Sequence, residues 1–278
     1  MTMLYVHWNV DPEIFSRGGF VLRYYSLLFA GGIATGYLLL KHMFLRDGIS
    51  LRYLDRLSWY LVVGILAGAR LGHCLFYEPG YYWAHPWEIF LPWVGFPGAK
   101  DFHYTGFQGL ASHGGAVGII LAVALFCRKY KMSFLTIMDK LAPVVPATGV
   151  FIRVGNLFNS EIIGRPSQLP FAFVFHRVDA VPRHPAQLYE AAAYLVIFCF
   201  LFFVLRRRAA HRPPGYLLGW LLILLFAARF TLEFFKEGQE MFEQHLPLDM
   251  GQLLSIPFLI AGFWLLRRSC HAPNITNG

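Results

Sequence analysis

The chain has 278 residues, of which 56% are hydrophobic and only 14% are charged. A soluble domain carries about 25% charged residues, so this composition excludes an ordinary soluble fold and indicates lipid contact. The net charge of +8 does not indicate nucleic-acid binding, because the cations stand in short groups between apolar runs. We therefore expect an all-α integral membrane protein, with a single polytopic membrane domain over residues 1–278.

Seven apolar runs are long enough to cross a bilayer, which takes roughly 20 residues at about 1.5 Å each. They are residues 18–40, 57–77, 108–127, 134–153, 186–205, 215–235 and 248–266. The fourth run contains Pro143 and Pro146, which predict a kink. Two connecting segments are long. Residues 78–107 are rich in Pro, Trp and Tyr, as is typical of an arm at the membrane interface, and residues 160–185 predict a small cap with a strand near 171–178.

The charges in the loops predict an orientation. Four clusters of cations follow alternate helix ends: Lys41, Arg46, Arg52 and Arg56; Arg128, Lys129 and Lys131; Arg206, Arg207, Arg208 and Arg212; Arg267 and Arg268. By the positive-inside rule the N-terminus is outside, the C-terminus is cytoplasmic, and the arm and the cap lie on the outer face. Asp139 and Lys140 then lie on the cytoplasmic side of their helix, where we expect a structural pair.

Cysteine and histidine spacing predicts neither a disulfide framework nor a metal site. The four cysteines form no CxxC pair, and all but Cys270 lie inside apolar runs. The eleven histidines show no HExxH or similar spacing. We expect no catalytic cysteine, no metal and no cofactor.

Polar side chains occur at one level of six expected helices, near the outer face. They are Tyr25, Arg70, His113, Arg153, Gln187, Glu190, Arg229 and Glu233. Ionisable residues inside a bilayer are costly and indicate function by default. The arginines exceed the nearby carboxylates, and a guanidinium presents a rigid fork of donors that matches phosphate oxygens. The anion available at this depth is a phospholipid headgroup. The alternative is a buried network that only fixes helix packing.

Spacing arranges part of this set. Arg229 and Glu233 are four residues apart, so they share a helical face and can pair. Arg153, Asn156 and Asn159 step by three and would form one stripe if the helix continues.

With these residues in place, the sequence resembles a known family, the bacterial prolipoprotein diacylglyceryl transferases. The matching stretches are GARLGHCLFY at 68–77, SHGGAVG at 112–118, RVGNLFNSEIIGRP at 153–166, RHPAQLYEA at 183–191, RFTLEFF at 229–235 and MGQLLSIP at 250–257. They follow the family's order and spacing from the N-terminal DPEIFS to the last helix. The asparagine-rich segment followed by HPAQLYE is specific for this family, whereas HGG alone would be weak evidence for the resemblance. Departures include Ser160 in place of a usual glycine and Lys236 in place of a frequent arginine.

The resemblance implies a seven-helix enzyme of the bacterial inner membrane. Such an enzyme transfers the sn-1,2-diacylglyceryl group of phosphatidylglycerol to the lipobox cysteine in the signal peptide of a prolipoprotein. It forms a thioether and releases glycerol phosphate, the first step of bacterial lipoprotein maturation. Its partners are phosphatidylglycerol, the prolipoprotein and the membrane. The resemblance implies catalytic roles for His113, Arg153 and Arg229. The expected substrate-binding residues are Tyr25, Arg70, Asn156, Asn159, Glu161, Gly164, Gln187, Glu190 and Glu233.

Several readings stay open. A carrier or channel for anionic lipids would use the same arginines without chemistry, and a diverged, catalytically silent paralogue would only bind phospholipid. The base is open too, since His113 could accept the thiol proton or the field of the arginines could favour the thiolate.

Overall fold

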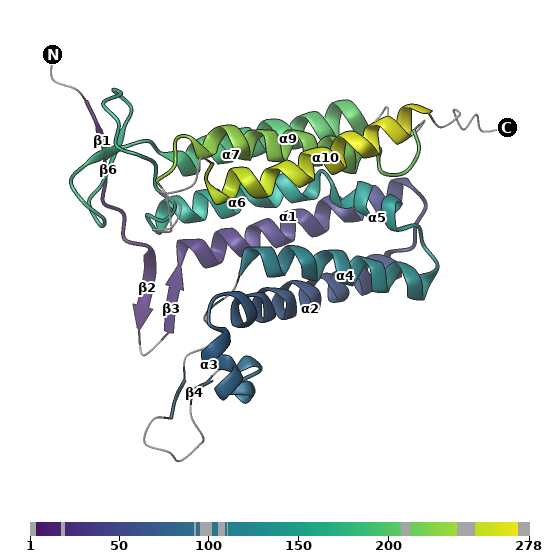
Figure 1. Ribbon diagram of the computed structural model, residues 1–278, viewed down its shortest axis with the longest axis horizontal. Coiled ribbons are helices and arrows are strands. Elements are labelled where there is room, and N and C mark those ends of the chain that lie inside the picture. The colour runs from purple at the N-terminus through teal and green to yellow at the C-terminus, as the bar shows by residue number, and fades with distance from the viewer. Residues whose placement is uncertain are drawn as a thin grey trace. The chain divides into compact units, whose positions relative to one another are not determined.

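The computed structural model describes residues 4–17, 20–91, 93–94, 102–104, 109, 111–206, 212–237 and 248–271. The chain divides into two units, which we call the first unit (Met1–Met43 and Met138–Gly278) and the second unit (Phe44–Ile137). Figure 1 labels the helices and colours them by residue number. The expectation of one membrane domain over residues 1–278 stays a prediction.

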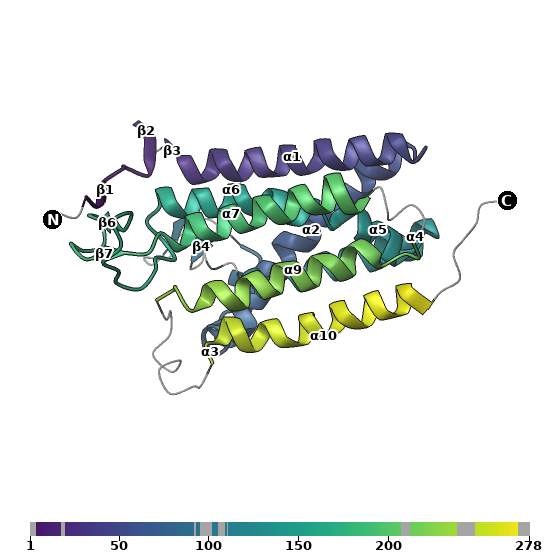
Figure 2. The ribbon, with the colours of Figure 1, turned by 90° about the horizontal axis from the view of Figure 1, so that it is seen from above.

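The first unit is built on long helices. They are α1 (Tyr24–Arg46), which continues into the second unit, the end of α5 (Phe134–Leu141), α6 (Val144–Phe158), α7 (Ala186–Cys199) with a π-helical extension η2 (Phe200–Leu205), α9 (Tyr216–Glu233) and α10 (Met250–His271). Helix α6 lies beside α7, and α9 lies beside both α7 and α10 (Figure 2). Close approach of α1 to α6 depends on small residues, since a Cβ on Gly36 would lie 3.0 Å from the Val144 side chain.

Short strands precede and interrupt these helices. Strand β6 (Phe173–Phe175) pairs in parallel with β1 (Val6–Trp8) and antiparallel with β7 (Pro182–Arg183). This sheet confirms the strand predicted near residues 171–178. Strands β2 (Glu13–Arg17) and β3 (Phe20–Arg23) form an antiparallel hairpin directly before α1.

The second unit pairs α2 (Leu51–Phe76) with α4 (Ser112–Tyr130). Between them in the chain lie α3 (Pro79–Ala84), the 3-10 turn η1 (Pro86–Ile89), and strands β4 (Trp93–Val94) and β5 (His103–Tyr104). Most of the expected arm therefore has secondary structure where the structure describes it.

Six of the described helical segments have the length and hydropathy to cross a membrane. They are Tyr24–Arg46, Leu51–Phe76, His113–Tyr130, Phe134–Phe158, Ala186–Leu205 and Tyr216–Glu233. They confirm an all-α multi-pass membrane protein. The seventh expected span corresponds to α10, a helix of 22 residues, and its crossing of the membrane stays a prediction.

Several helix ends differ from the apolar runs. The first helix begins at Tyr24, because residues 13–17 and 20–23 use their backbone hydrogen bonds in the pair of β2 with β3. Residue 18, its expected start, lies outside the described residues. Helix α2 begins at Leu51 instead of residue 57, after Ser50 accepts a hydrogen bond from the Arg52 backbone. The third helix begins at Ser112, since Ala111 is extended. Residue 108, its expected start, lies outside the described residues. An apolar run marks contact with hydrocarbon, and a helix need not end where that contact ends.

The predicted kink in the fourth span is confirmed. Helix α5 ends at Leu141 and α6 starts at Val144, with Pro143 at the junction. Asp139, just before this break, accepts hydrogen bonds from the backbone N–H groups of Gly215 (2.7 Å) and Leu218 (2.8 Å). Its role is therefore structural, as expected, but its carboxylate caps the start of α9.

Candidate active site

The end of α6 carries the predicted polar stripe. The Arg153 Nη1 donates to Asn156 Oδ1 at 3.3 Å. The side-chain amides of Asn156 and Asn159 then donate to the two oxygens of Glu161, each at 3.1 Å. The stripe therefore exists, and its two asparagines hold the Glu161 carboxylate in place.

The turn after α6 brings Glu161 back toward the helix. Ser160 and Ile162 adopt left-handed backbone angles, with φ of 54° and 56°. Glycine enters this region freely, whereas other residues are strained there by roughly 1–2 kcal/mol. Ser160 stands where the resembled family usually has glycine. The left-handed backbone angle at this position explains why glycine is usual there. Backbone strain of this kind is typical of functional sites.

Arg153 also takes part in a buried chain of alternating charges. Its Nε lies 2.9 Å from Glu190 Oε2. The Lys236 Nζ lies 3.2 Å from Glu190 Oε1 and 3.1 Å from Glu233 Oε2. Glu190 is fully buried and Lys236 is only 6% exposed. Two cations thus neutralise two carboxylates, which buried charges require. We call Arg153, Glu190, Lys236 and Glu233 the ion chain.

The position of Lys236 is fixed by its backbone. Lys236 lies beyond the end of α9 and forms a bridge with Gly164. Its carbonyl accepts a hydrogen bond from Arg165 Nε at 2.8 Å. Gly164 has no room for a side chain, since an added Cβ would lie 2.6 Å from the His184 Cβ and 2.8 Å from the Phe235 carbonyl. The conformation around Gly164 thus holds Lys236 between the two carboxylates.

The pair that the spacing allows between Arg229 and Glu233 does not form. Glu233 pairs with Lys236 instead, because the chain turns back after α9 and brings the amine within reach. Arg229 is half-buried and has no hydrogen-bond or ion-pair partner among the residues that the structure describes. It lies one helical turn before Glu233. Arg229 therefore offers donors next to the ion chain, while Arg153 is already held by Glu190 and Asn156.

Two further predicted residues lie against α6 and its turn. Gln187 is fully buried, and its Nε2 donates to the Glu161 carbonyl at 2.6 Å. Its Oε1 is buried and has no partner within the described part of the chain. Tyr25 packs on α6, where a Cβ on Gly155 would lie 2.8 Å from its ring.

Arg70 and His113 belong to the second unit. Arg70 donates to the carbonyls of Glu88 (2.6 Å) and Ile89 (3.1 Å), and its guanidinium lies 4.9 Å from the Tyr82 ring centre. It therefore anchors the segment after α2, and its expected substrate-binding role stays a prediction. The His113 side chain is exposed near the start of α4.

Outside the membrane-spanning segments, two contacts shift pKa values. The hydrogen bond from the Tyr81 hydroxyl to Glu88 raises the pKa of Tyr81 to about 12. Hydrogen bonds from the Arg183 guanidinium lower the pKa of Asp179, and the same bonds raise the pKa of Arg183. Arg183 also donates to Glu237 at 2.8 Å. These pairs fix loop segments.

Lys236 is the member of the site that sequence reasoning missed. It was noted only as a departure from the resembled family, and its spacing from Glu190 gives no hint of contact. The signal that could have identified it was the frequent arginine at this position, since two cationic residue types alternating at one site indicate a required positive charge.

These helices and this buried network define a multi-pass membrane protein with a polar site at the ends of α6, α7 and α9. The family model of prolipoprotein diacylglyceryl transferase matches residues 12–268. The chain belongs to this family.

Similar proteins occur in several bacteria and are named phosphatidylglycerol–prolipoprotein diacylglyceryl transferase. One from Bacteroides fragilis is 46% identical over 264 residues, covering 95% of this chain and 95% of its own length. One from Tolumonas auensis is 43% identical over 260 residues, covering 93% and 95%. One from Porphyromonas gingivalis is 40% identical over 285 residues, covering 97% and 96%. The similarity therefore extends over nearly the whole chain.

Proposed function

We propose that this chain transfers the diacylglyceryl group of phosphatidylglycerol to the cysteine thiol of a prolipoprotein. The observation that carries the proposal is the half-buried Arg229 guanidinium, which has no partner among the described residues and lies beside the ion chain. A half-buried guanidinium without a partner favours an anion, and the phosphate of phosphatidylglycerol supplies one. Family membership and the names of the relatives support the choice of substrates.

The reaction requires two kinds of assistance. The sulfur of the lipobox cysteine attacks the glyceryl carbon that carries the phosphate, a C–S bond forms, and the C–O bond breaks. Glycerol phosphate leaves with the bonding electron pair, so fixed donors near its oxygens lower the barrier. We assign this role to Arg229. Arg153 assists from a position set by Glu190 and Asn156.

The thiol must also lose its proton, since the thiolate is the attacking species. We assign this proton to His113, whose imidazole is exposed near the start of α4 and can act as a general base. Asn156, Asn159 and Glu161 would bind the glycerol hydroxyls of the headgroup, with the buried Gln187 Oε1 as a further acceptor.

We place the protein in the bacterial cytoplasmic membrane, with the N-terminus outside and the C-terminus inside. The cation clusters between the helices support this orientation. Reporter fusions at the C-terminus and within residues 160–185 test it. A C-terminal fusion that is active only outside the cytoplasm would contradict it.

The experiment that tests the activity uses purified protein reconstituted with phosphatidylglycerol and a lipobox peptide. We expect mass spectrometry to find the diacylglyceryl thioether on the peptide and glycerol phosphate in solution. Arg153→Lys keeps the charge and loses the fork, so it should lose most of the activity. The control is Arg177→Lys, since Arg177 is a surface residue with a 3.8 Å contact to Asp11. Bound lipid with an unmodified peptide would favour a carrier or a silent lipid-binding paralogue.

A further inference from the structure

Helices α2 and α4 of the second unit touch through their backbones. Glycines follow each other at every fourth residue on α2 and face glycines on α4. A Cβ on Gly68 would lie 2.8 Å from the Gly118 Cα, and one on Gly72 would lie 2.7 Å from the Gly114 Cα. Because the two helices cannot separate or rotate without breaking this contact, they form a rigid surface.

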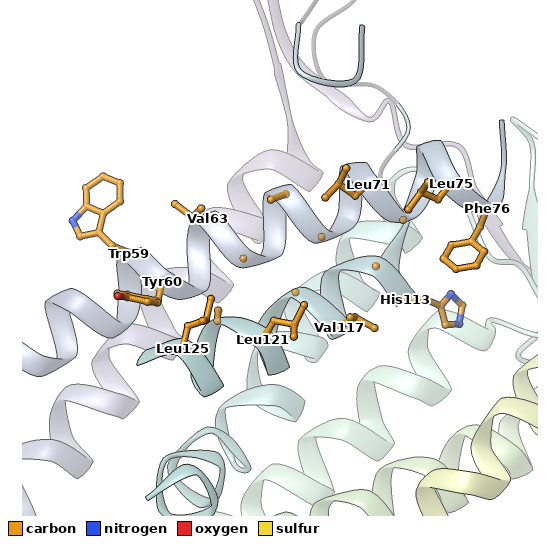
Figure 3. A pocket seen from close by; sticks show the side chains of 17 residues that line it. Trp59, Tyr60, Val63, Leu71, Leu75, Phe76, His113, Val117, Leu121 and Leu125 are labelled. Atoms are coloured by element: carbon orange, nitrogen blue, oxygen red, sulfur yellow. The ribbon is translucent and has the colours of Figure 1, made fainter. Parts of the chain in front are cut away.

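A groove runs along this pair, and we call it the α2–α4 groove. It has a volume of about 800 Å³ and is lined by side chains of both helices, among them Val63, Leu71 and Leu75 on α2 and Val117, Leu121 and Leu125 on α4 (Figure 3). Several of these side chains are more than half exposed, including Val63, Leu75 and Leu121. An exposed apolar surface of this extent marks a binding site or contact with lipid.

The length of the groove distinguishes its possible occupants. Its lining runs on α2 from Trp59 to Phe76, which corresponds to roughly 26 Å of helix. That is most of the hydrocarbon core of about 30 Å, whereas an acyl chain from one leaflet covers about half of the core. The apolar segment of a signal peptide has about 7–15 residues, so as a helix it extends over about 10–22 Å. The groove is therefore long enough to hold the whole apolar segment of a signal peptide as a helix.

The residues at the two ends of the groove indicate the direction in which a signal peptide would lie. His113 is the one imidazole among the residues that line the groove, and it lies at the same end as Phe76 (Figure 3). Trp59 and Tyr60 line the opposite end. In a signal peptide the processing region follows directly after the apolar segment. A signal peptide lying in the groove with its processing region toward Phe76 would carry the lipobox cysteine to His113.

We propose that the α2–α4 groove holds the apolar segment of the prolipoprotein signal peptide and delivers the substrate thiol to His113. This inference rests on the proposed function, because it takes the prolipoprotein as the substrate. The glycine contact supplies the rigid wall, the leucine and valine side chains supply apolar area, and His113 supplies the base at the end where the cysteine arrives.

Filling the groove tests the inference by kinetics. Leu121→Trp adds bulk inside the groove, and Ile120→Trp is the matched control, since Ile120 is exposed on the same helix and does not line the groove. We expect Leu121→Trp to raise KM for the lipobox peptide by about tenfold or more, as for a misfit in an apolar pocket. KM for phosphatidylglycerol and kcat at saturating peptide should change little, and Ile120→Trp should leave both KM values unchanged. A raised KM for phosphatidylglycerol alone would mean that acyl chains occupy the groove, and unchanged KM values in both variants would mean contact with bulk lipid; either result overturns the inference.

Cross-linking tests it without turnover. A lipobox peptide with a photoreactive residue in its apolar segment is bound to the wild-type protein, and the cross-linked residues are mapped by mass spectrometry. We expect cross-links to α2 and α4 near Leu71 and Leu121. Cross-links elsewhere, or between two copies of the protein at these helices, would overturn the inference. Cross-links at the groove from a wild-type protein that leaves the peptide unmodified would instead contradict the proposed function.

Discussion

The two units differ in their polar side chains. In the first unit the ion chain pairs four charged side chains with one another, and two of them, Glu190 and Lys236, are buried. In the second unit α2 and α4 meet through glycine backbone and present an apolar groove with His113 at one end. The comparison teaches that charges in the first unit support both stability and chemistry, whereas in the second unit the glycines support packing and the apolar side chains of the groove are available for binding.

Lys236 should give the largest effect on stability. Lys236→Met removes the cation between Glu190 and Glu233, so Glu190 keeps only Arg153 as a partner and Glu233 loses its cation. Breaking a buried pair in this way lowers the free energy of unfolding by about 3–5 kcal/mol. Denaturation in detergent measures this loss, and Lys236→Arg, which keeps the charge, should recover most of it. Equal stability of the Met variant and the wild type would show that the ion chain is not structural.

Substitution of Arg229 should lower the reaction rate without lowering the free energy of unfolding. Arg229→Ala should lower kcat by about 10²–10³-fold, the usual effect of removing a donor to a developing oxyanion. Its unfolding free energy should hardly change, because Arg229 has no partner among the described residues. Arg153→Ala should lower both quantities, since it also leaves Glu190 without its 2.9 Å partner. A full-rate Arg229→Ala enzyme would remove Arg229 from the mechanism.

Substitution of Gly68 tests the packing of α2 against α4 in the second unit. Gly68→Ala places a Cβ against the Gly118 backbone, where nothing can yield without moving α4. Overpacking of this kind lowers the free energy of unfolding by about 1–3 kcal/mol. Gly80→Ala is the matched control, because no atom lies within 4 Å of its added Cβ. Equal stability of both variants would contradict the close glycine contact.

The Asp179–Arg183 pair should give the smallest effect, through pH. Because Arg183 lowers the pKa of Asp179, the pair contributes stability above the ordinary aspartate pKa of about 3.9. That contribution is lost as the pH falls through the lowered pKa, so the difference between wild type and Asp179→Asn should vanish in strong acid. The Asp179 side chain is 29% exposed, so this difference should be much smaller than that of Lys236→Met. Thermal melting of both proteins from pH 7 to pH 2 measures it, and a difference that persists at pH 2 would contradict the assignment.

Much of the fold could be predicted from the sequence because hydropathy alone locates helices in lipid. The kink at Pro143 and the strand near residue 173 followed from local chemistry and are confirmed. The start of α1 at Tyr24 could not be predicted, since pairing of β2 with β3 competes with helix formation.

The candidate site also has a part that could be predicted from the sequence and a part that could not. The stripe of Arg153, Asn156 and Asn159 depends only on helical periodicity, and the sequence contained it. The ion chain depends on where the chain goes after α9 ends, so the spacing of Arg229 and Glu233 allowed a pair that does not form. Asp139 bonds to Gly215, far along the chain, which no local pattern reveals.

The most direct test of the account is the rate of thioether formation by Arg229→Ala, measured by mass spectrometry at saturating phosphatidylglycerol and lipobox peptide. The account predicts a folded protein of wild-type stability that forms the diacylglyceryl peptide about 10²–10³-fold more slowly. Wild-type formation of the product by Arg229→Ala, or no product from the wild type itself, would contradict it.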